Sequence, residues 1–377
     1  MIRKTILSLL VCVLVWPALA FGDVILTPKE IRQTLSHGPW PPSFEPDPSN
    51  RVSGDPAAIK LGKTLFFDPT LSKSGDMACA TCHQAERSFT DGLPRAQGQV
   101  ELNRNTQALW NLRTQRWFGW SGDTDSIWAQ SLTPLFNEDE MGHNPVSLHL
   151  AMTEGRHASA YEAVFGDLIK TKPVDAAVNV SKVLAAYIET LTTGVTSFDK
   201  FRDALARGDM RSAAAYPRAA QRGLKTFLGH GRCAFCHSGP AFSNGEFHDA
   251  GVPYFLERGR VDAGRFAGIQ SLKESAFTLA GPYNDDPAKS GAWAVNNVRF
   301  QHSNFGVFRV PTLRRAAQTS PYMHDGSIPQ LVDVLEHYNN INTERLHADG
   351  EAILRPLALK EEEIRDLLAF LRTLADD

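Results

Sequence analysis

The sequence has little net charge and no hydrophobic run long enough to cross a membrane. Its 39 lysine and arginine residues nearly balance 42 aspartate and glutamate residues, which leaves a formal net charge of -3. This balance provides no charged field for nucleic acid or for an anionic membrane, so a small molecule or another protein is the expected partner. The length of 377 residues and the hydrophobic fraction of 42% indicate a folded protein of two domains.

The N-terminus has the features of a secretory signal. Arg3 and Lys4 precede an apolar run over residues 6–16, and small residues follow at Ala18 and Ala20. This pattern predicts a signal peptide over residues 1–20 and a mature protein in the periplasm, without membrane insertion. A membrane anchor is the alternative, but the run is shorter than the roughly 20 apolar residues that a spanning helix needs.

Cysteine is scarce, and four of the five cysteines form two Cys-x-x-Cys-His motifs; the fifth, Cys12, lies in the predicted signal peptide. The motif residues are Cys79, Cys82 and His83, and Cys233, Cys236 and His237. Thiols one helical turn apart can both add to the vinyl groups of one porphyrin, and the next residue can reach its iron. The motifs therefore predict two covalently bound haem c groups, with His83 and His237 as axial ligands. Disulfides, a zinc site or a thioredoxin-like dithiol would leave both histidines unexplained.

Hydrophobic periodicity predicts a mainly α fold of two c-type cytochrome domains joined by long ordered loops. Amphipathic helices are expected over residues 57–66, 175–193, 217–228, 329–338 and 360–375. Glycine and proline punctuate long loops over residues 238–268 and 281–311, and residues 39–48 form a proline-rich extended stretch. A weak repeat relates residues 82–89 to residues 236–242. We therefore expect domains over residues 21–200 and 201–377, with the boundary near residues 197–210.

Several short motifs follow in a fixed order along the mature chain. They are Leu65–Pro69, Asn105-Thr106, Trp120, Gln130 with Pro134, Glu140–Gly142, Val310–Arg314 and Pro321–Gly326. In these motifs the sequence resembles the bacterial di-haem cytochrome c peroxidases and their MauG branch over nearly its whole mature length. The resemblance implies an enzyme that uses hydrogen peroxide. It also implies a calcium ion bound between the two haem domains. Calcium would take the side-chain oxygen of Asn105 and the backbone carbonyls of Thr319 and Pro321.

The resemblance also implies the environment of the first haem. No histidine occurs between Gln84 and Gly142, where other peroxidases of the family have a removable distal histidine, so this iron should be five-coordinate. Glu140 matches the distal glutamate that moves a proton between the peroxide oxygens, and Gln130 matches the glutamine that orients peroxide. Glu138 and Asp139 are rivals for this role, and all three acids could instead belong to a solvated loop.

At the second haem the family places a methionine fourteen residues after the histidine of the Pro-Tyr-x-His-Asp-Gly motif. Here that histidine is His324, which we also expect beside the haem, and the count ends on Tyr338. A tyrosine ligand resembles the MauG branch and would favour oxidised iron. The alternatives are ligation by His337 or by Met323, and a Tyr338 that only packs in the core.

Trp120 matches the tryptophan that lies between the two haems in this family, which implies a role in electron transfer between them. The residues alone do not distinguish it from its neighbours Trp110, Trp117 and Trp128, any of which could be core filler.

Three functions are compatible with these features. The first is the use of a peroxide-generated high-valent haem pair to oxidise a partner protein side chain, a tryptophan, as MauG and the MauG-like protein MbnH do. The second is peroxide detoxification with electrons from a small redox protein. The third is a plain electron carrier, which an open iron position disfavours. Gly231 stands where MauG has a surface tryptophan, so the electron route to a partner should differ.

Overall fold

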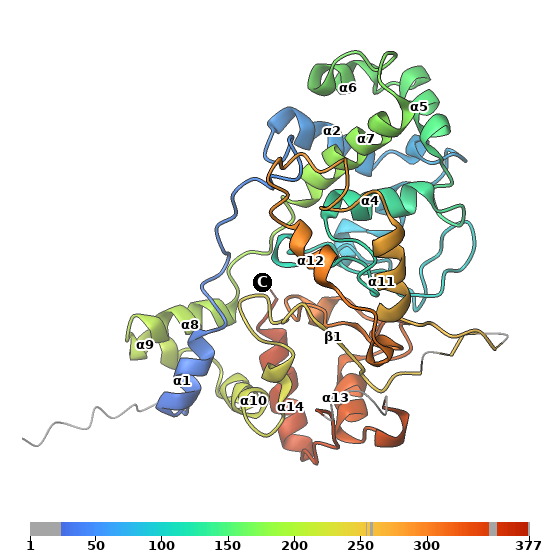
Figure 1. The fold of residues 1–377 in the computed structure, drawn as a ribbon. Helices are drawn as coiled ribbons and strands as arrows, with labels where there is room; N and C mark the ends of the chain where they lie inside the picture. The colour runs from blue at the N-terminus through green and yellow to red at the C-terminus, as the bar shows by residue number, and fades with distance from the viewer. Residues whose placement is uncertain (1–23, 254, 257–258, 347–352, 376–377) are drawn as a thin grey trace, which may run out of the picture.

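The structure, a computed structural model, describes residues 24–253, 255–256, 259–346 and 353–375 (Figure 1). The predicted signal peptide lies outside these residues. The described helices are α1 (Pro28–Leu35), α2 (Pro56–Phe66), α3 (Cys79–Cys82), α4 (Ile127–Phe136), α5 (Pro145–Glu154), α6 (Ala158–Phe165), α7 (Pro173–Ile188), α8 (Ser197–Ala206), α9 (Met210–Ala214), α10 (Arg218–Leu228), α11 (Arg265–Glu274), α12 (Ala292–Asn297), α13 (Leu331–Asn339) and α14 (Glu361–Arg372). In this part of the chain no helix is long and apolar enough to span a bilayer.

The mainly α prediction is confirmed, and all five helices expected from periodicity are present as α2, α7, α10, α13 and α14. The bounds predicted for the longest helix, residues 175–193, were wrong at both ends, since α7 begins at Pro173 and ends at Ile188. Proline suits this start because the first turn of a helix needs no amide donor there. The two long loops also contain regular structure: α11 begins inside the first, α12 lies in the second, and strands β1 (Phe247–His248) and β2 (Phe308–Arg309) pair antiparallel across them.

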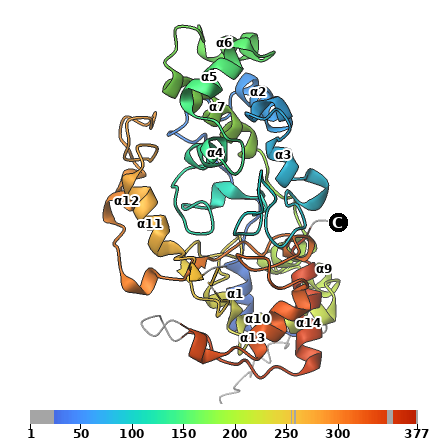
Figure 2. The same ribbon diagram turned by 90° about the vertical axis from the view of Figure 1, so that its right-hand side faces the viewer.

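Two hydrophobic cores organise the helices. The first surrounds α7, which packs against α2, α4 and α5 and buries thirteen of its sixteen residues, as expected for a helix that is apolar on most faces. The second lies between α10 and α14 and contains Phe198, Phe227, Phe242 and Phe370. Figure 2 shows the two groups of helices at opposite ends of the molecule.

Each core brings two helices together at a glycine. A Cβ on Gly62 of α2 would lie 1.8 Å from the carbonyl oxygen of Val183 in α7, and one on Gly223 of α10 would lie 2.0 Å from that of Asp366 in α14. Such contacts exclude any side chain. Both cores therefore use the same close helix crossing.

Two segments pack on the core of the other half of the sequence. Near the N-terminus, Val24 and Leu26 belong to the second core. In the other direction, Phe277 and Tyr283 pack against the first core, and Lys182 of α7 donates from Nζ to the Tyr283 carbonyl at 2.8 Å. This crossing fixes how the two halves sit on each other.

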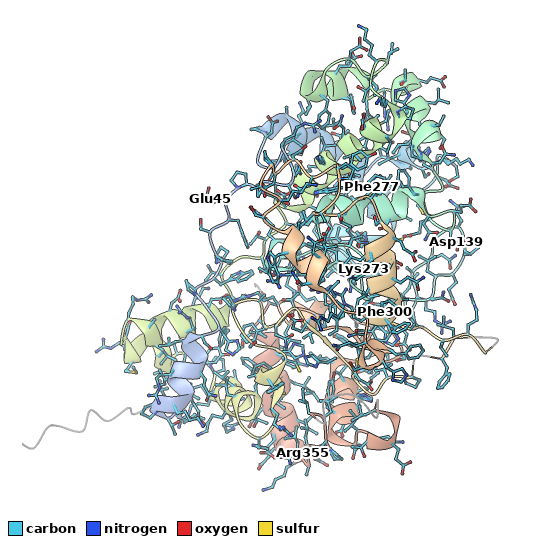
Figure 3. All side chains as sticks on the ribbon, viewed as in Figure 1. Glu45, Asp139, Lys273, Phe277, Phe300 and Arg355 are labelled. Atoms are coloured by element: carbon cyan, nitrogen blue, oxygen red, sulfur yellow. The ribbon has the colours of Figure 1, made fainter. Side chains whose placement is uncertain are left out.

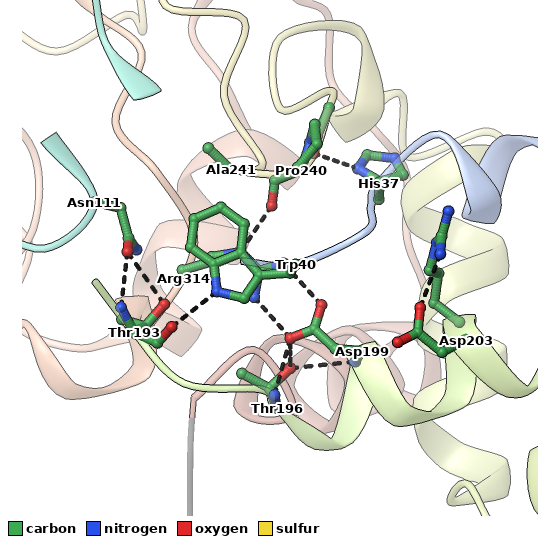
Figure 4. A network of polar contacts seen from close by, with 12 residues as sticks. His37, Trp40, Asn111, Thr193, Thr196, Asp199, Asp203, Pro240, Ala241 and Arg314 are labelled. Carbon is green, nitrogen blue, oxygen red and sulfur yellow. Dashed lines mark hydrogen bonds and ion pairs between the residues drawn. The ribbon is translucent and has the colours of Figure 1, made fainter. Parts of the chain in front are cut away.

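A buried polar network also ties distant segments together (Figure 4). The guanidinium of Arg314 pairs with both carboxylate oxygens of Asp199 in α8, at 2.9 and 2.8 Å, and donates to the Pro240 carbonyl at 2.7 Å. It lies 3.7 Å from the ring centroid of Trp40, whose Nε1 donates to the Thr193 carbonyl at 3.0 Å. The network thus connects the N-terminal segment, α8 and the loop after the second Cys-x-x-Cys-His motif.

We predict that Asp199→Asn lowers the free energy of unfolding by about 3–5 kcal/mol, because it removes the carboxylate that pairs with the buried charge of Arg314. Asp203→Asn in the same helix is the matched control. Its ion pair with Arg202 is partly exposed, so the loss should be at most about 1 kcal/mol. Guanidinium unfolding followed by circular dichroism measures both, and equal stabilities of the two variants would contradict this role of the network.

Candidate functional site

The first Cys-x-x-Cys-His motif forms the one-turn helix α3, and His83 caps its C-terminus. The Nδ1–H of His83 donates to the carbonyl oxygen of Phe89 at 3.1 Å, and burial lowers the pKa of His83. The imidazole is therefore neutral, and its Nε2 keeps a lone pair for a metal. Phe89 directs its carbonyl from a left-handed backbone, with φ of +58°, which is unusual for an aromatic residue.

The second motif repeats this arrangement. Cys233–Phe235 form a single turn, and the Nδ1–H of His237 donates to the Phe242 carbonyl at 3.0 Å. Burial lowers the pKa of His237 to about 4, and Phe242 has φ of +52°. The weak sequence repeat ends on these two phenylalanines. The repeat could have pointed to them, but their part in holding the histidines was not predicted from the sequence.

The four motif cysteines are free thiols, which argues against a disulfide framework. Burial raises the pKa of Cys79 and of Cys233 to about 12 and that of Cys82 to about 11. Within the described residues, no group of three or more His, Cys, Asp or Glu side chains could hold a metal ion.

A cavity of about 700 Å³ opens beside the second motif, and it has the walls that a haem requires. Its apolar wall includes Phe227, Leu335 and Leu371. Its polar wall includes Gln107 and Arg309, whose Nε2 and Nη1 atoms are buried without a hydrogen-bond partner. Burial lowers the pKa of Arg309 to about 10, and in the described chain no carboxylate offsets that burial. A haem carries two propionates, so an anionic group in this cavity would satisfy both donors.

The structure sets His337 apart from the other two candidates for the second axial position. Tyr338 and Met323 line the cavity together with His237, whereas His337 does not, and its Nε2 is bonded to the Ala250 carbonyl at 2.7 Å. Burial, and then the two nearby thiols of the second motif, raises the pKa of Tyr338. Leu335, one turn earlier in α13, belongs to the second core. Tyr338 and Leu335 both line the cavity, so this face of α13 connects the cavity wall to the second core.

The three neighbouring acids after α4 also differ. Glu140 is half-buried, accepts from Asn137 Nδ2 at 2.8 Å and has a pKa that burial raises. Its charge acts on the thiols of both cysteines in the first motif, so it lies near that motif. Glu138 and Asp139 are exposed, and Figure 3 shows Asp139 at the outer edge of the molecule.

Gln130 lies in α4, and its Oε1 accepts from Thr124 Oγ1 at 2.7 Å. In the part of the chain that is described, no hydrogen bond joins it to Glu140. Among the described residues, Glu140 therefore interacts with the first motif, whereas Gln130 bonds to Thr124.

A chain of hydrogen bonds crosses the wall of the cavity. Trp120 Nε1 donates to the backbone carbonyl of Asn105 at 2.9 Å, and the backbone N–H of Asn105 donates to the His324 carbonyl at 2.8 Å. These three residues, Thr319 and Pro321 all line the cavity, whereas Trp110, Trp117 and Trp128 do not. His324 is buried and stacks on Phe308 with ring centroids 3.6 Å apart.

The residues proposed for calcium supply oxygen atoms. Asn105 Nδ2 donates to the carbonyls of Leu93 and Pro94, at 2.8 and 3.3 Å, so that its Oδ1 remains available. Thr319 and Pro321 line the same cavity as Asn105, and each has a backbone carbonyl oxygen. Such a neutral, all-oxygen set fits calcium better than a transition metal.

Comparison with known proteins gives a consistent result. Residues 56–207 match the family of di-haem cytochrome c peroxidases. The chain is 34% identical over 321 residues to the methylamine utilization protein MauG of Methylorubrum extorquens, covering 85% of this chain and 78% of that protein. It is 29% identical to the cytochrome-c peroxidase IdrP2 of Pseudomonas sp., covering 91% of this chain and 86% of that one.

Two solved structures share the fold at 22% sequence identity. One is a MauG-like protein associated with microbial copper homeostasis, with a TM-score of 0.68 over 90% of this chain and 96% of that chain. The other is the diheme peroxidase BthA of Burkholderia thailandensis, with a TM-score of 0.69 over 88% and 89% of the two chains. The predicted fold of two c-type cytochrome domains is confirmed, and the chain belongs to the family of di-haem cytochrome c peroxidases and MauG, whose members hold two haem groups.

Proposed function

We propose that the protein is a periplasmic oxidoreductase that uses hydrogen peroxide to oxidise a tryptophan side chain of a partner protein by long-range electron transfer. The observation that carries the proposal is that Tyr338 lines the cavity beside His237, at the position where other peroxidases of the family have a methionine. The bound haems would supply iron that exchanges electrons and an open iron position for peroxide. A tyrosine oxygen is a hard anionic ligand that favours oxidised iron, which suits oxidation of a partner better than uptake of electrons from a carrier.

Glu140 would handle the proton at the first haem. Reduction of one peroxide to two waters consumes two electrons and two protons, and the O–O bond breaks most easily when a proton moves to the leaving oxygen. Partial burial and the hydrogen bond from Asn137 support this role for Glu140, because they fix its carboxyl group near the first motif. Gln130 would orient the peroxide from α4.

Trp120 would connect the two haem sites electronically, which its place on the cavity wall and its hydrogen bond to Asn105 support. A calcium ion held by Asn105, Thr319 and Pro321 would stabilise the same wall. Because these residues come from both halves of the sequence, the ion would also fix the distance between the two sites.

Peroxide detoxification with electrons from a small redox protein is the second candidate. Relatives named cytochrome-c peroxidases match 84–91% of this chain at 27–30% identity, which favours it. The tyrosine in the cavity argues against it, since iron with a low reduction potential is a poor entry point for electrons.

Mass spectrometry of a partner separates the two functions. The ferric holoprotein is incubated with peroxide and each protein encoded beside its gene, and partner masses are compared with and without peroxide. We expect one partner to change mass at a tryptophan peptide. Sustained oxidation of reduced cytochrome c by peroxide, with no change in any partner, would instead establish detoxification.

Glu140→Gln tests the proton-transfer role. The amide keeps the size of the side chain but cannot exchange the proton, so we expect the peroxide-induced change in the haem absorption spectrum to slow by about 10²–10⁴-fold. Glu138→Gln, at an exposed position two residues away, should react like the wild type. Stopped-flow spectroscopy measures both rates, and an unchanged rate in Glu140→Gln would reject the role.

A further inference from the structure

Positive charges cover almost every tryptophan of the described chain. Five indole rings have a guanidinium carbon or an ammonium nitrogen within 5.3 Å of the ring centroid. The pairs are Arg314 with Trp40 at 3.7 Å, Arg265 with Trp117 at 4.4 Å, Arg315 with Trp110 at 4.7 Å, Arg116 with Trp293 at 4.8 Å and Lys182 with Trp128 at 5.3 Å. Figure 4 shows the first of these pairs.

Trp120 is the exception. Among the described residues no cation lies over its ring, and its indole N–H donates to the neutral carbonyl of Asn105. It is also the only tryptophan of this part of the chain that lines the cavity. The uncovered indole is therefore the one that lines the cavity beside the second motif.

A cation over an indole opposes its oxidation. An indole that loses one electron becomes a radical cation, and its new positive charge is repelled by a guanidinium about 4–5 Å away. The ground state is favoured for the opposite reason, since the neutral ring attracts the cation. Both effects make the electron harder to remove.

We propose that these cations protect the five covered tryptophans from oxidation and leave Trp120 as the indole that can give up an electron. The inference rests on the proposed function, because peroxide is the oxidant. It assigns a redox role to Arg116, Arg265 and Arg315, which otherwise look like ordinary surface and packing residues. Arg314 and Lys182 also form ion pairs with Asp199 and Asp285, which hold the two cations in place over their rings.

Trp110 is the covered tryptophan with most need of protection. Its ring packs edge-on against Phe89 with centroids 5.1 Å apart, and the carbonyl of Phe89 holds His83. Its Nε1 is buried without a hydrogen-bond partner. Arg315 reaches it from the other half of the sequence, so one contact both joins the halves and covers the indole.

The test gives the holoprotein peroxide without a partner and locates oxidation by peptide mass spectrometry. In the net reaction one tryptophan and one peroxide form hydroxytryptophan and one water, so the peptide gains one oxygen. We expect Arg315→Gln to raise the oxidised fraction of Trp110 by about tenfold, since at the dielectric constant typical near a protein surface the Coulomb energy lost at this distance exceeds that of a tenfold change. Arg315→Lys keeps the charge and should match the wild type, in which Trp120 is the main site.

Two results would overturn the proposal. One is equal oxidation of Trp110 in Arg315→Gln and the wild type while peroxide reacts normally with the haems. The other is an Arg315→Lys variant that behaves like Arg315→Gln, because packing rather than charge would then be responsible.

A second arm does not depend on the proposed function. Trp293 is 56% exposed, so a photo-oxidant in solution reaches it without haem chemistry. Arg116→Gln should raise its oxidation by about two- to threefold over Arg116→Lys, a smaller effect because water screens exposed charges. If peroxide does not react with the haems, the proposed function fails and this arm alone decides. Equal oxidation of Trp293 in the two variants then rejects protection by charge.

Discussion

A hydrogen bond from Nδ1 to a phenylalanine carbonyl holds each motif histidine, and the geometry of both sites depends on it. The bond selects the tautomer in which Nε2 has a free lone pair, and it aims that lone pair away from the loop. Phe89 and Phe242 make it from a strained, left-handed backbone that their packing stabilises, one in each core. Each histidine is thereby fixed to the rigid part of its own half.

The two halves share this proximal arrangement and differ in what surrounds it. The first motif has a half-buried glutamate, Glu140, whereas the second faces a cavity with Tyr338 and an unsatisfied Arg309. In the proposed function, the first site would serve proton transfer and the second would hold an anionic oxygen on iron. Arg315 and the Asn105–His324 bond join the halves at the wall between them.

Local patterns in the sequence predicted the parts that depend on local physics. Periodicity located five helices, and motif spacing located both histidines, because each signal lies within one or two turns of chain. Periodicity missed α4, which contains Pro134, and α5, whose apolar residues do not gather on one face. It could not separate Glu140 from Asp139, since their exposure is set by the fold. The cations over the tryptophans come from distant segments, so no local pattern marks them.

Electron paramagnetic resonance of the resting ferric protein tests the central claim most directly, that the two sites share a proximal side and differ on the distal side. We expect one high-spin signal from a five-coordinate iron at His83 and one low-spin signal from a six-coordinate iron at His237. Tyr338→Phe should change only the low-spin signal, and Tyr322→Phe, which removes a second tyrosine hydroxyl of the cavity, should change neither. Two low-spin, six-coordinate irons in the wild type would contradict the account.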